Sequence, residues 1–457
     1  MWEAGWAQSQ PAHLIGIIGG LDSFNQQSSA TDWVRSVVRR NRRGEAAGLY
    51  SVCSANPWVL KAAIGQALDD GAALSIESTS NQVNQFGGYT GLTPGRFADF
   101  AGSIADRAGL PRQRILLGGD HLGPYPWRQE PASAALDKAC ESVRQCVLAG
   151  YAKIHLDASM RCAGDPDGTL DERVIAARGA VLCRAAEEAR GGAVPGPLYV
   201  IGTEVPVPGG EQAAAGEPSV SRPEDAERTL HYSRAAFLEH GLEDAWQRVV
   251  GLVVQPGVEF GDALIFEYDR VKAGRLSGNL PRRPELVYEA HSTDYQTPKA
   301  LREMVEDHFA ILKVGPWLTF AFREAVFALS QIERETLGRR RGIRNSRVRE
   351  CLEDVMVRDP AHWAAYYRGE EEDIRIARMF SYSDRCRYYW SEPSVETELD
   401  LLVANLSAHR PPLTLLSQYL PVQYEAVRAG ILENVPAKLI EHQIRGVLRV
   451  YAGACIG

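Results

Sequence analysis

The sequence predicts an α/β protein built on a (β/α)8 barrel, with a helical appendage at its C-terminal end. Between residues 48 and 337, short apolar segments alternate with polar or glycine-rich turns and helical segments, and the pattern occurs eight times. The apolar segments are continuous rather than alternating, as in parallel strands that are buried on both faces. No Gly-x-Gly-x-x-Gly turn follows the first of them, which disfavours an open dinucleotide-binding sheet.

The elements are expected in the following order. Residues 1–47 form an N-terminal segment, with one amphipathic helix within 28–47. Asn56-Pro57 and Thr93-Pro94 each place a capping residue before a proline, so a helix is expected to begin at both points. The eight strands are expected at residues 48–55, 72–78, 114–120, 152–158, 197–205, 248–254, 285–291 and 309–314.

A charged linker at residues 338–342 marks a change of character. Residues 338–457 are rich in Tyr, Trp and Arg and predict a helical region that packs on the barrel. Within it, helices are expected at residues 348–357, 361–368, 395–406 and 436–451.

Bulk composition excludes several classes of protein. The net charge of −8 is mild and both signs are mixed along the chain, so nucleic acid is not an expected partner. No apolar run approaches the roughly 20 residues that cross a bilayer. The eight cysteines are scattered without a Cys-x-x-Cys pair, which indicates neither a disulfide framework nor a zinc knuckle. We therefore expect a reduced, cytoplasmic enzyme.

Ionisable and polar residues gather at the predicted C-terminal ends of the strands, where the active sites of such barrels lie. They are Glu77, Asp120, His121, Lys153, His155, Asp157, Glu204, Gln255, Glu289, His291 and Lys313. One such group is often a satisfied core residue, but burial is costly unless the group is paired or liganded. The ionisable residues among them recur at six strand ends, which indicates a functional site.

The residue types suggest a divalent metal. His121, Glu204 and His291 offer two imidazoles and a carboxylate, a set that suits zinc first, with manganese, cobalt and nickel as alternatives. Gln255 is a candidate for a weaker oxygen ligand. Glu77, Asp120, Asp157 and Glu204 are candidates for acid–base catalysis.

Longer motifs carry a family resemblance. They lie at residues 53–55, 78–91, 117–124, 153–160, 202–211, 255–260, 288–297 and 383–390. In this order they resemble the family of the so-called non-catalytic subunit of tagatose-1,6-bisphosphate aldolase, from about residue 48 to the C-terminus. Asn56 departs from the family pattern, where a His is expected, and Gln255 stands at the position of a metal-binding His.

The resemblance implies a class II aldolase-like barrel that acts in hexose-phosphate metabolism. Its metal ligands would fall on His121 and His291, with Asp120 as the acid–base residue. Some members serve as partners of a separate catalytic subunit, and others resemble stand-alone epimerases that interconvert tagatose 6-phosphate and fructose 6-phosphate. No Gly-x-x-x-x-Gly-Lys-Ser/Thr loop follows any predicted strand, which disfavours a kinase.

The chemistry of C4 inversion favours the epimerase. A 2-ketose carbonyl acidifies the proton on C3 rather than on C4, so inversion would proceed by cleaving and re-forming the C3–C4 bond at a metal. We therefore expect a metal-dependent ketohexose-6-phosphate 4-epimerase, with a non-catalytic stabilising subunit of the aldolase as the alternative.

The expected partners are a phosphorylated ketohexose, a class II aldolase catalytic subunit and further copies of this chain. Binding to a membrane is not expected. A phosphate is expected on the loops after the seventh and eighth strands. The candidate substrate-binding residues are Asn81, Gln85, His155, Ser292, Thr293, Asp294, Lys313, Gly315, Arg385 and Arg387.

Overall fold

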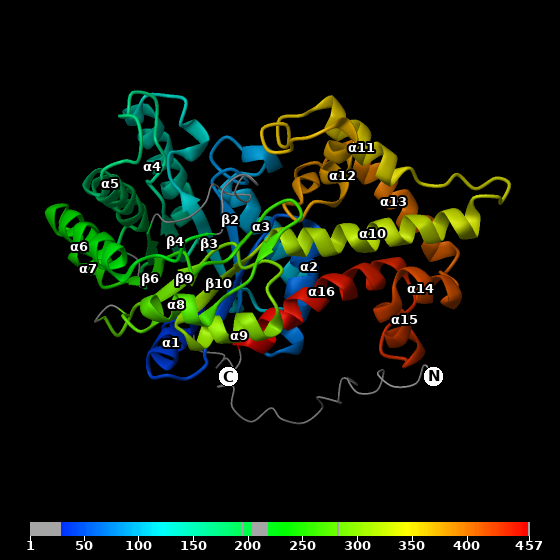
Figure 1. Ribbon diagram of the computed structural model, residues 1–457, viewed down its shortest axis with the longest axis horizontal. Helices are drawn as coiled ribbons and strands as arrows, with labels where there is room; N and C mark the ends of the chain where they lie inside the picture. Colours follow the sequence, from blue (N-terminus) through cyan, green and yellow to red (C-terminus); the bar gives the residue numbers. More distant parts are fainter. Residues whose placement is uncertain (1–28, 193–194, 203–217, 281–282, 456–457) are drawn as a thin grey trace.

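The computed structural model describes residues 29–192, 195–202, 218–280 and 283–455, which include a closed barrel of eight parallel strands (Figure 1). The predicted (β/α)8 fold is therefore confirmed. Around the barrel the strand order is β1-β10-β9-β6-β5-β4-β3-β2. The strands are β1 (Leu49–Cys53), β2 (Leu74–Thr79), β3 (Ile115–Leu122), β4 (Lys153–Leu156), β5 (Leu198–Ile201), β6 (Val249–Val253), β9 (Val287–Ala290) and β10 (Phe309–Val314).

Helices that follow the strands form the outer layer. Asn56 begins the first of them, because its side-chain oxygen accepts the backbone N–H groups of Trp58 and Val59. These helices are α2 (Pro57–Asp69), α3 (Pro94–Ala108), α4 (Ala132–Leu148), α5 (Glu172–Arg190), α6 (Pro223–Glu239), α7 (Glu243–Trp246), α8 (Arg270–Ser277), α9 (Pro298–Glu306) and α10 (Pro316–Leu337).

The helix α1 (Ala30–Arg42) covers the N-terminal end of the barrel. Ser29 caps it in a reciprocal arrangement with Asp32. Its buried Val34, Val37 and Val38 belong to the same apolar cluster as the first residues of several strands. Since this end is closed by apolar packing, the polar strand ends lie at the opposite end.

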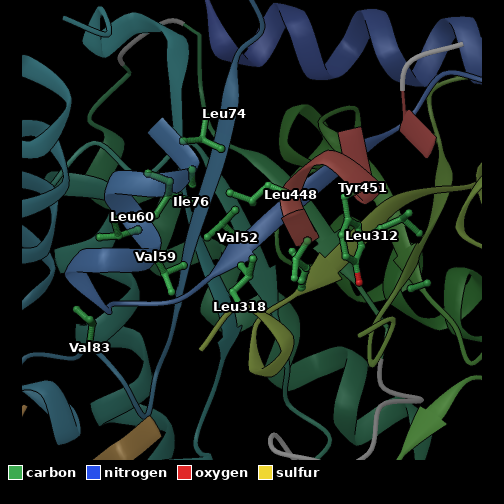
Figure 2. Packing of buried hydrophobic residues seen from close by; sticks show 14 of the residues in the cluster. Val52, Val59, Leu60, Leu74, Ile76, Val83, Leu312, Leu318, Leu448 and Tyr451 are labelled. Atoms are coloured by element: carbon green, nitrogen blue, oxygen red, sulfur yellow. The ribbon is translucent and has the colours of Figure 1, made fainter. Parts of the chain in front are cut away.

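The last helix, α16 (Pro436–Cys455), completes the outer layer of the barrel. It contacts α2, α9, α10 and β1, and Leu448 and Tyr451 lie beside Val52 and Leu312 in the apolar layer between strands and helices (Figure 2). The C-terminal region therefore contributes directly to barrel packing. The division at residues 47 and 337 stays a prediction.

The region between α10 and α16 differs in detail from expectation. It contains α11 (Val348–Arg358), α12 (Glu371–Phe380), α13 (Pro393–Ala408), α14 (Leu413–Tyr419) and α15 (Pro421–Arg428). The helix expected at residues 361–368 is wrong, because this segment forms turns in which the Trp363 indole N–H donates to the Met356 carbonyl. The sequence also did not predict α12, α14, α15 or the hairpin of β7 (Glu259–Phe260) and β8 (Ile265–Phe266).

In the described ranges, none of the helices combines the length and apolar character that crossing a membrane requires.

Candidate metal centre

A ladder of buried ion pairs occupies the inside of the barrel. The Lys153 ammonium lies 2.9 Å from Glu77 Oε1 and 2.7 Å from Glu289 Oε2, and all three side chains are fully buried. Lys313 contacts the second oxygen of Glu77, lies 2.8 Å from Asp120 Oδ1 and lies 3.6 Å from Glu289 Oε1. Each of these charges has an opposite partner, which is the condition for burying it.

A glycine makes room for this ladder. Gly118 of β3 pairs with Glu77 on one side and with Lys153 on the other. A Cβ atom at Gly118 would lie 2.7 Å from Glu77 Cγ, far inside contact distance. Glu77 can reach Lys153 across β3 because this position carries no side chain.

Above the ladder, His121 from β3 and His291 after β9 meet face to edge. His121 Nε2 lies 3.2 Å from His291 Nδ1. Two imidazole nitrogens that share one tetrahedral zinc ion at 2.0–2.1 Å stand about 3.4 Å apart. The spacing therefore fits a pair of ligands to one metal ion.

The other nitrogen of each ring is held by a carboxylate. His121 Nδ1 lies 2.8 Å from Asp157 Oδ2, and His291 Nε2 lies 3.0 Å from Glu289 Oε1. If these nitrogens donate, the lone pairs of Nε2 in His121 and Nδ1 in His291 both face the shared space. Carboxylates in this second position fix the tautomer and orientation of metal-binding histidines.

His155 and Asp120 complete the group. Ligand atoms of Asp120, His121, His155 and His291 all lie within 4.8 Å of one another, and all four residues are buried. His155 Nδ1 lies 3.1 Å from Asp120 Oδ1, while its Nε2 is buried without a hydrogen-bond partner among the residues that the structure describes. A buried, unsatisfied imidazole nitrogen is costly, and a metal ion would satisfy it.

The charges of the cluster also favour a divalent cation. Glu77, Glu289, Asp120 and Asp157 face two ammonium groups, so two negative charges remain when the imidazoles are neutral. Burial lowers the pKa of His291 to about 4, which keeps this ring neutral at pH 7. Burial alone would also lower the pKa of His121, but Asp120 and Asp157 outweigh it and raise that pKa.

Asp120 is held firmly as an anion. Burial alone would raise its pKa, but Lys313, His121 and the hydrogen bond with His155 bring the pKa well below its ordinary value. A second group of possible ligands, formed by Cys53, Glu77 and Asp120, surrounds the Lys313 ammonium. Since Lys313 already pairs with both carboxylates, the chain supplies its own cation there.

The backbone is strained at both histidine loops. His121 adopts φ 47° and Ser292, next to His291, adopts φ 53°, values that are uncommon for residues other than glycine. At His121 the pairing of β3 with β4 shifts register between Gly119 and Leu122. Strain of this kind clusters at functional sites, where surrounding contacts maintain it.

The remaining predicted ligands have different surroundings. Glu204 lies outside the described residues. The side-chain oxygen of Gln255 accepts the backbone N–H groups of Gly257 and Val258, so it is engaged in its own loop. Its role as a metal ligand stays a prediction, and these contacts do not support it.

The residues predicted to bind phosphate are engaged inside the protein. Asp294, which lies among them, accepts the backbone N–H groups of Gly315 and Trp317 at the start of α10. The Thr293 hydroxyl donates to the Lys313 carbonyl. The Gly315 N–H therefore donates to an internal carboxylate. The phosphate site at this helix stays a prediction, and these contacts do not support it.

The predicted arginine clamp is also engaged. Arg385 is buried, donates to the His362 carbonyl and stacks on the Tyr366 ring. Arg387 donates to the Asp384 carbonyl and to the Tyr388 hydroxyl.

The loop after β2 carries the last two substrate candidates. The Gln85 amide donates to the Lys138 carbonyl, and Asn81, earlier in the same loop, is partly buried. Their roles stay predictions. Sequence reasoning noticed Glu289 but gave it no role, although its spacing of two residues from His291 places both side chains on one face of the strand.

Comparisons with known proteins agree on one family. The family described as D-tagatose-1,6-bisphosphate aldolase subunit GatZ/KbaZ-like matches residues 34–456. Two relatives, each named D-tagatose-1,6-bisphosphate aldolase subunit GatZ, come from Salmonella agona and Salmonella typhimurium. Each is 49% identical over 423 residues, which cover 92% of this chain and 99% of the relative.

A solved structure is similar over most of its length. It is described as a probable tagatose 6 phosphate kinase from Sinorhizobium meliloti 1021, with 47% identity and a TM-score of 0.82. The match covers 89% of this chain and 100% of that one.

These comparisons overturn the main functional expectation. The curated relatives carry the name of an aldolase subunit, not that of an epimerase. The prediction of a stand-alone ketohexose-6-phosphate 4-epimerase is therefore wrong, and the alternative of an accessory subunit is favoured.

Proposed function

Because the chain belongs to the D-tagatose-1,6-bisphosphate aldolase subunit GatZ/KbaZ-like family, we propose that it is an accessory subunit of a class II tagatose-1,6-bisphosphate aldolase. In this role it binds a separate catalytic polypeptide and slows the loss of that polypeptide's activity. The observation that carries the proposal is the 49% identity to relatives with this name, over nearly their whole length. Phosphorylated ketohexoses are the substrate class of the assembly.

The charge state of the strand-end acids supports this role. A general base works best when its pKa lies near the operating pH. The pKa of Asp120 lies well below its ordinary value, despite the opposing effect of burial, because Lys313 and His121 favour the anion. Glu77 is locked between two lysines at the centre of the barrel. Both carboxylates are thus suited to remaining ionised, as fixed negative charges, rather than to exchanging protons.

The histidine cluster is part of the proposal as a site for one divalent metal ion, zinc first. His121 and His291 would hold it through nitrogens that are 3.2 Å apart, with His155 and Asp120 close enough to contribute. A divalent ion there would polarise a bound carbonyl oxygen. Asp157 and Glu289 lie against the other nitrogen of each ring and would favour the tautomers that such an ion requires.

Co-purification and inactivation kinetics test the accessory role. The full chain and a class II tagatose-1,6-bisphosphate aldolase catalytic subunit are mixed, and light scattering measures the mass of the complex. We expect a mixed complex in which aldolase activity survives heating longer than it does in the catalytic subunit alone. The chain alone should cleave no tagatose 1,6-bisphosphate.

Two results would contradict the proposal. One is the absence of a complex together with an unchanged inactivation rate. The other is aldol cleavage by the isolated chain after metal is added. A matched control mixes the catalytic subunit with an unrelated (β/α)8 barrel at equal concentration, because added protein alone can slow inactivation.

A further inference from the structure

A polar cavity of about 450 Å³ lies between α10, α11 and α12, away from the barrel mouth. Its first contact on α10 is Ser330, fourteen residues beyond Pro316. At 1.5 Å per residue, this is about 21 Å along the helix from the end of β10. Figure 1 shows α11 and α12 on the same side of α10, and this side carries the cavity.

Three arginines from three different helices line the cavity. Arg334 comes from α10, Arg349 from α11 and Arg375 from α12. Arg375 pairs with Glu372 of its own helix, 2.6 Å away. Within the part of the chain that the structure describes, neither Arg334 nor Arg349 has a carboxylate oxygen within 4.0 Å.

Arg349 lies in the wall of the cavity among other positive charges. Its guanidinium lies 4.9 Å from the centre of the Phe327 ring, which holds it in the wall of the cavity. Burial lowers the pKa of Arg349, and the neighbouring Arg334 and Arg375 lower it further although Glu350 opposes them. An anion placed between the three groups would remove this repulsion, and the planar guanidinium matches a phosphate or carboxylate in two-point contact.

The rest of the lining offers hydrogen-bond acceptors. Glu350 and Glu353 line the same cavity, together with Asn345. One oxygen of Glu353 accepts hydrogen bonds from Arg378. The other, like the Asn345 side-chain oxygen, is buried and accepts none from the described ranges of the chain. Acceptors without donors suit a ligand that carries hydroxyl groups, once the side chains turn toward it.

We propose that this cavity is a binding site for a sugar phosphate, with the phosphate between Arg334, Arg349 and Arg375 and the hydroxyl groups on the acidic wall. The volume admits a molecule of this size and excludes a folded partner. This assignment is independent of the proposed accessory role, because it uses no residue of the barrel mouth.

Calorimetric titration of the full chain tests the site, with inorganic phosphate and glucose 6-phosphate as separate probes. Glucose 6-phosphate should bind more tightly than inorganic phosphate, because it adds hydroxyl donors. Arg349→Gln and Arg334→Gln should each weaken both probes about tenfold or more, the usual effect of losing a charge-assisted hydrogen bond. Arg339→Gln, in the exposed linker, removes the same charge outside the cavity and should change affinity by less than about twofold.

Arg349→Gln also removes packing on Phe327, so a folding defect is possible for that variant alone. Arg334 is exposed, and its variant should fold normally. Unchanged affinity in Arg334→Gln, or no binding of either probe to the unmodified chain, would overturn the site. Equal affinity for the two probes would overturn the assignment of a sugar.

Discussion

The orientation of His121 by Asp157 leads to a quantitative prediction about metal affinity. Asp157 Oδ2 lies 2.8 Å from His121 Nδ1, while Oδ1 accepts the backbone N–H and the hydroxyl of Ser159. In Asp157→Asn, the side-chain oxygen can still accept the two hydrogen bonds from Ser159, and the amide NH2 then faces His121 Nδ1. That nitrogen must then accept, so the ring proton moves to Nε2, the atom that faces His291.

The substitution therefore blocks one ligand and also removes one negative charge from the cluster. Outer carboxylates of this kind are typically worth about 10–100-fold in metal affinity. We expect Asp157→Asn to bind zinc about 10–100-fold more weakly at pH 7.5 than the unmodified chain. Competition with a chromophoric chelator measures the affinity, and elemental analysis measures the stoichiometry.

The pH dependence gives a second check. Asp157 helps to raise the pKa of His121, so protons compete with the metal more strongly in the unmodified chain. The zinc affinities of the unmodified chain and of Asp157→Asn should therefore become more similar as the pH falls.

Asp165→Asn is the matched control, because its carboxylate lies in the same loop and binds Arg178 outside the cluster. An affinity of Asp157→Asn within about twofold of that of the control would refute this account of His121.

Three further predictions concern stability, each measured by urea unfolding. Lys153→Met leaves buried carboxylates without an ammonium and should cost about 3–5 kcal/mol, whereas the half-exposed Lys138→Met should cost less than about 1 kcal/mol; equal losses would contradict the buried ladder. Burial raises the pKa of Asp294 from 3.8 to about 6, so its contribution to stability is full below pH 3.8 and is lost as the pH rises through about 6. The free energy of unfolding of Asp294→Asn, compared with that of the unmodified chain, should therefore rise by about 3 kcal/mol between pH 4 and pH 7. If the difference between the two proteins does not change with pH, this pKa is wrong. In Gly123→Ala the new Cβ would lie 1.6 Å from a backbone oxygen, so a loss of about 1–3 kcal/mol or more is expected, while Gly95→Ala meets no atom within 4 Å and should not destabilise.

The barrel could be predicted because each of its signals is local. Continuous apolar runs and capping pairs such as Asn56-Pro57 recur at short range, and both follow from elementary backbone geometry. The position of α16 has no local signal. An amphipathic helix reveals that it has an apolar face, but not that this face will cover β1 between α2 and α10.

The limits at the site are of the same kind. The pairing of His121 with His291 follows from their positions at the same end of a parallel barrel. The ladder below them depends on strand register, which places Gly118 between Glu77 and Lys153 and lets the two side chains meet. Register is not encoded in any one strand, so the sequence identified the acids but not the ion pairs that they form, and their assignment to catalysis stays a prediction.

The ion pairs of the strand-end acids also bear on whether the chain is an accessory or a catalytic subunit. Acid–base catalysis by a carboxylate is most efficient when the pKa of the group lies near the operating pH. Here Lys313 favours the anionic form of Asp120, and the two lysines of the ladder fix both oxygens of Glu77. A barrel can therefore keep the residue types of an active site while its lysines fix the acids as anions, which hold the histidine rings in place and would balance a bound cation. If the chain is an accessory subunit, as proposed, its strand-end residues preserve a binding site and proton transfer takes place in the catalytic subunit.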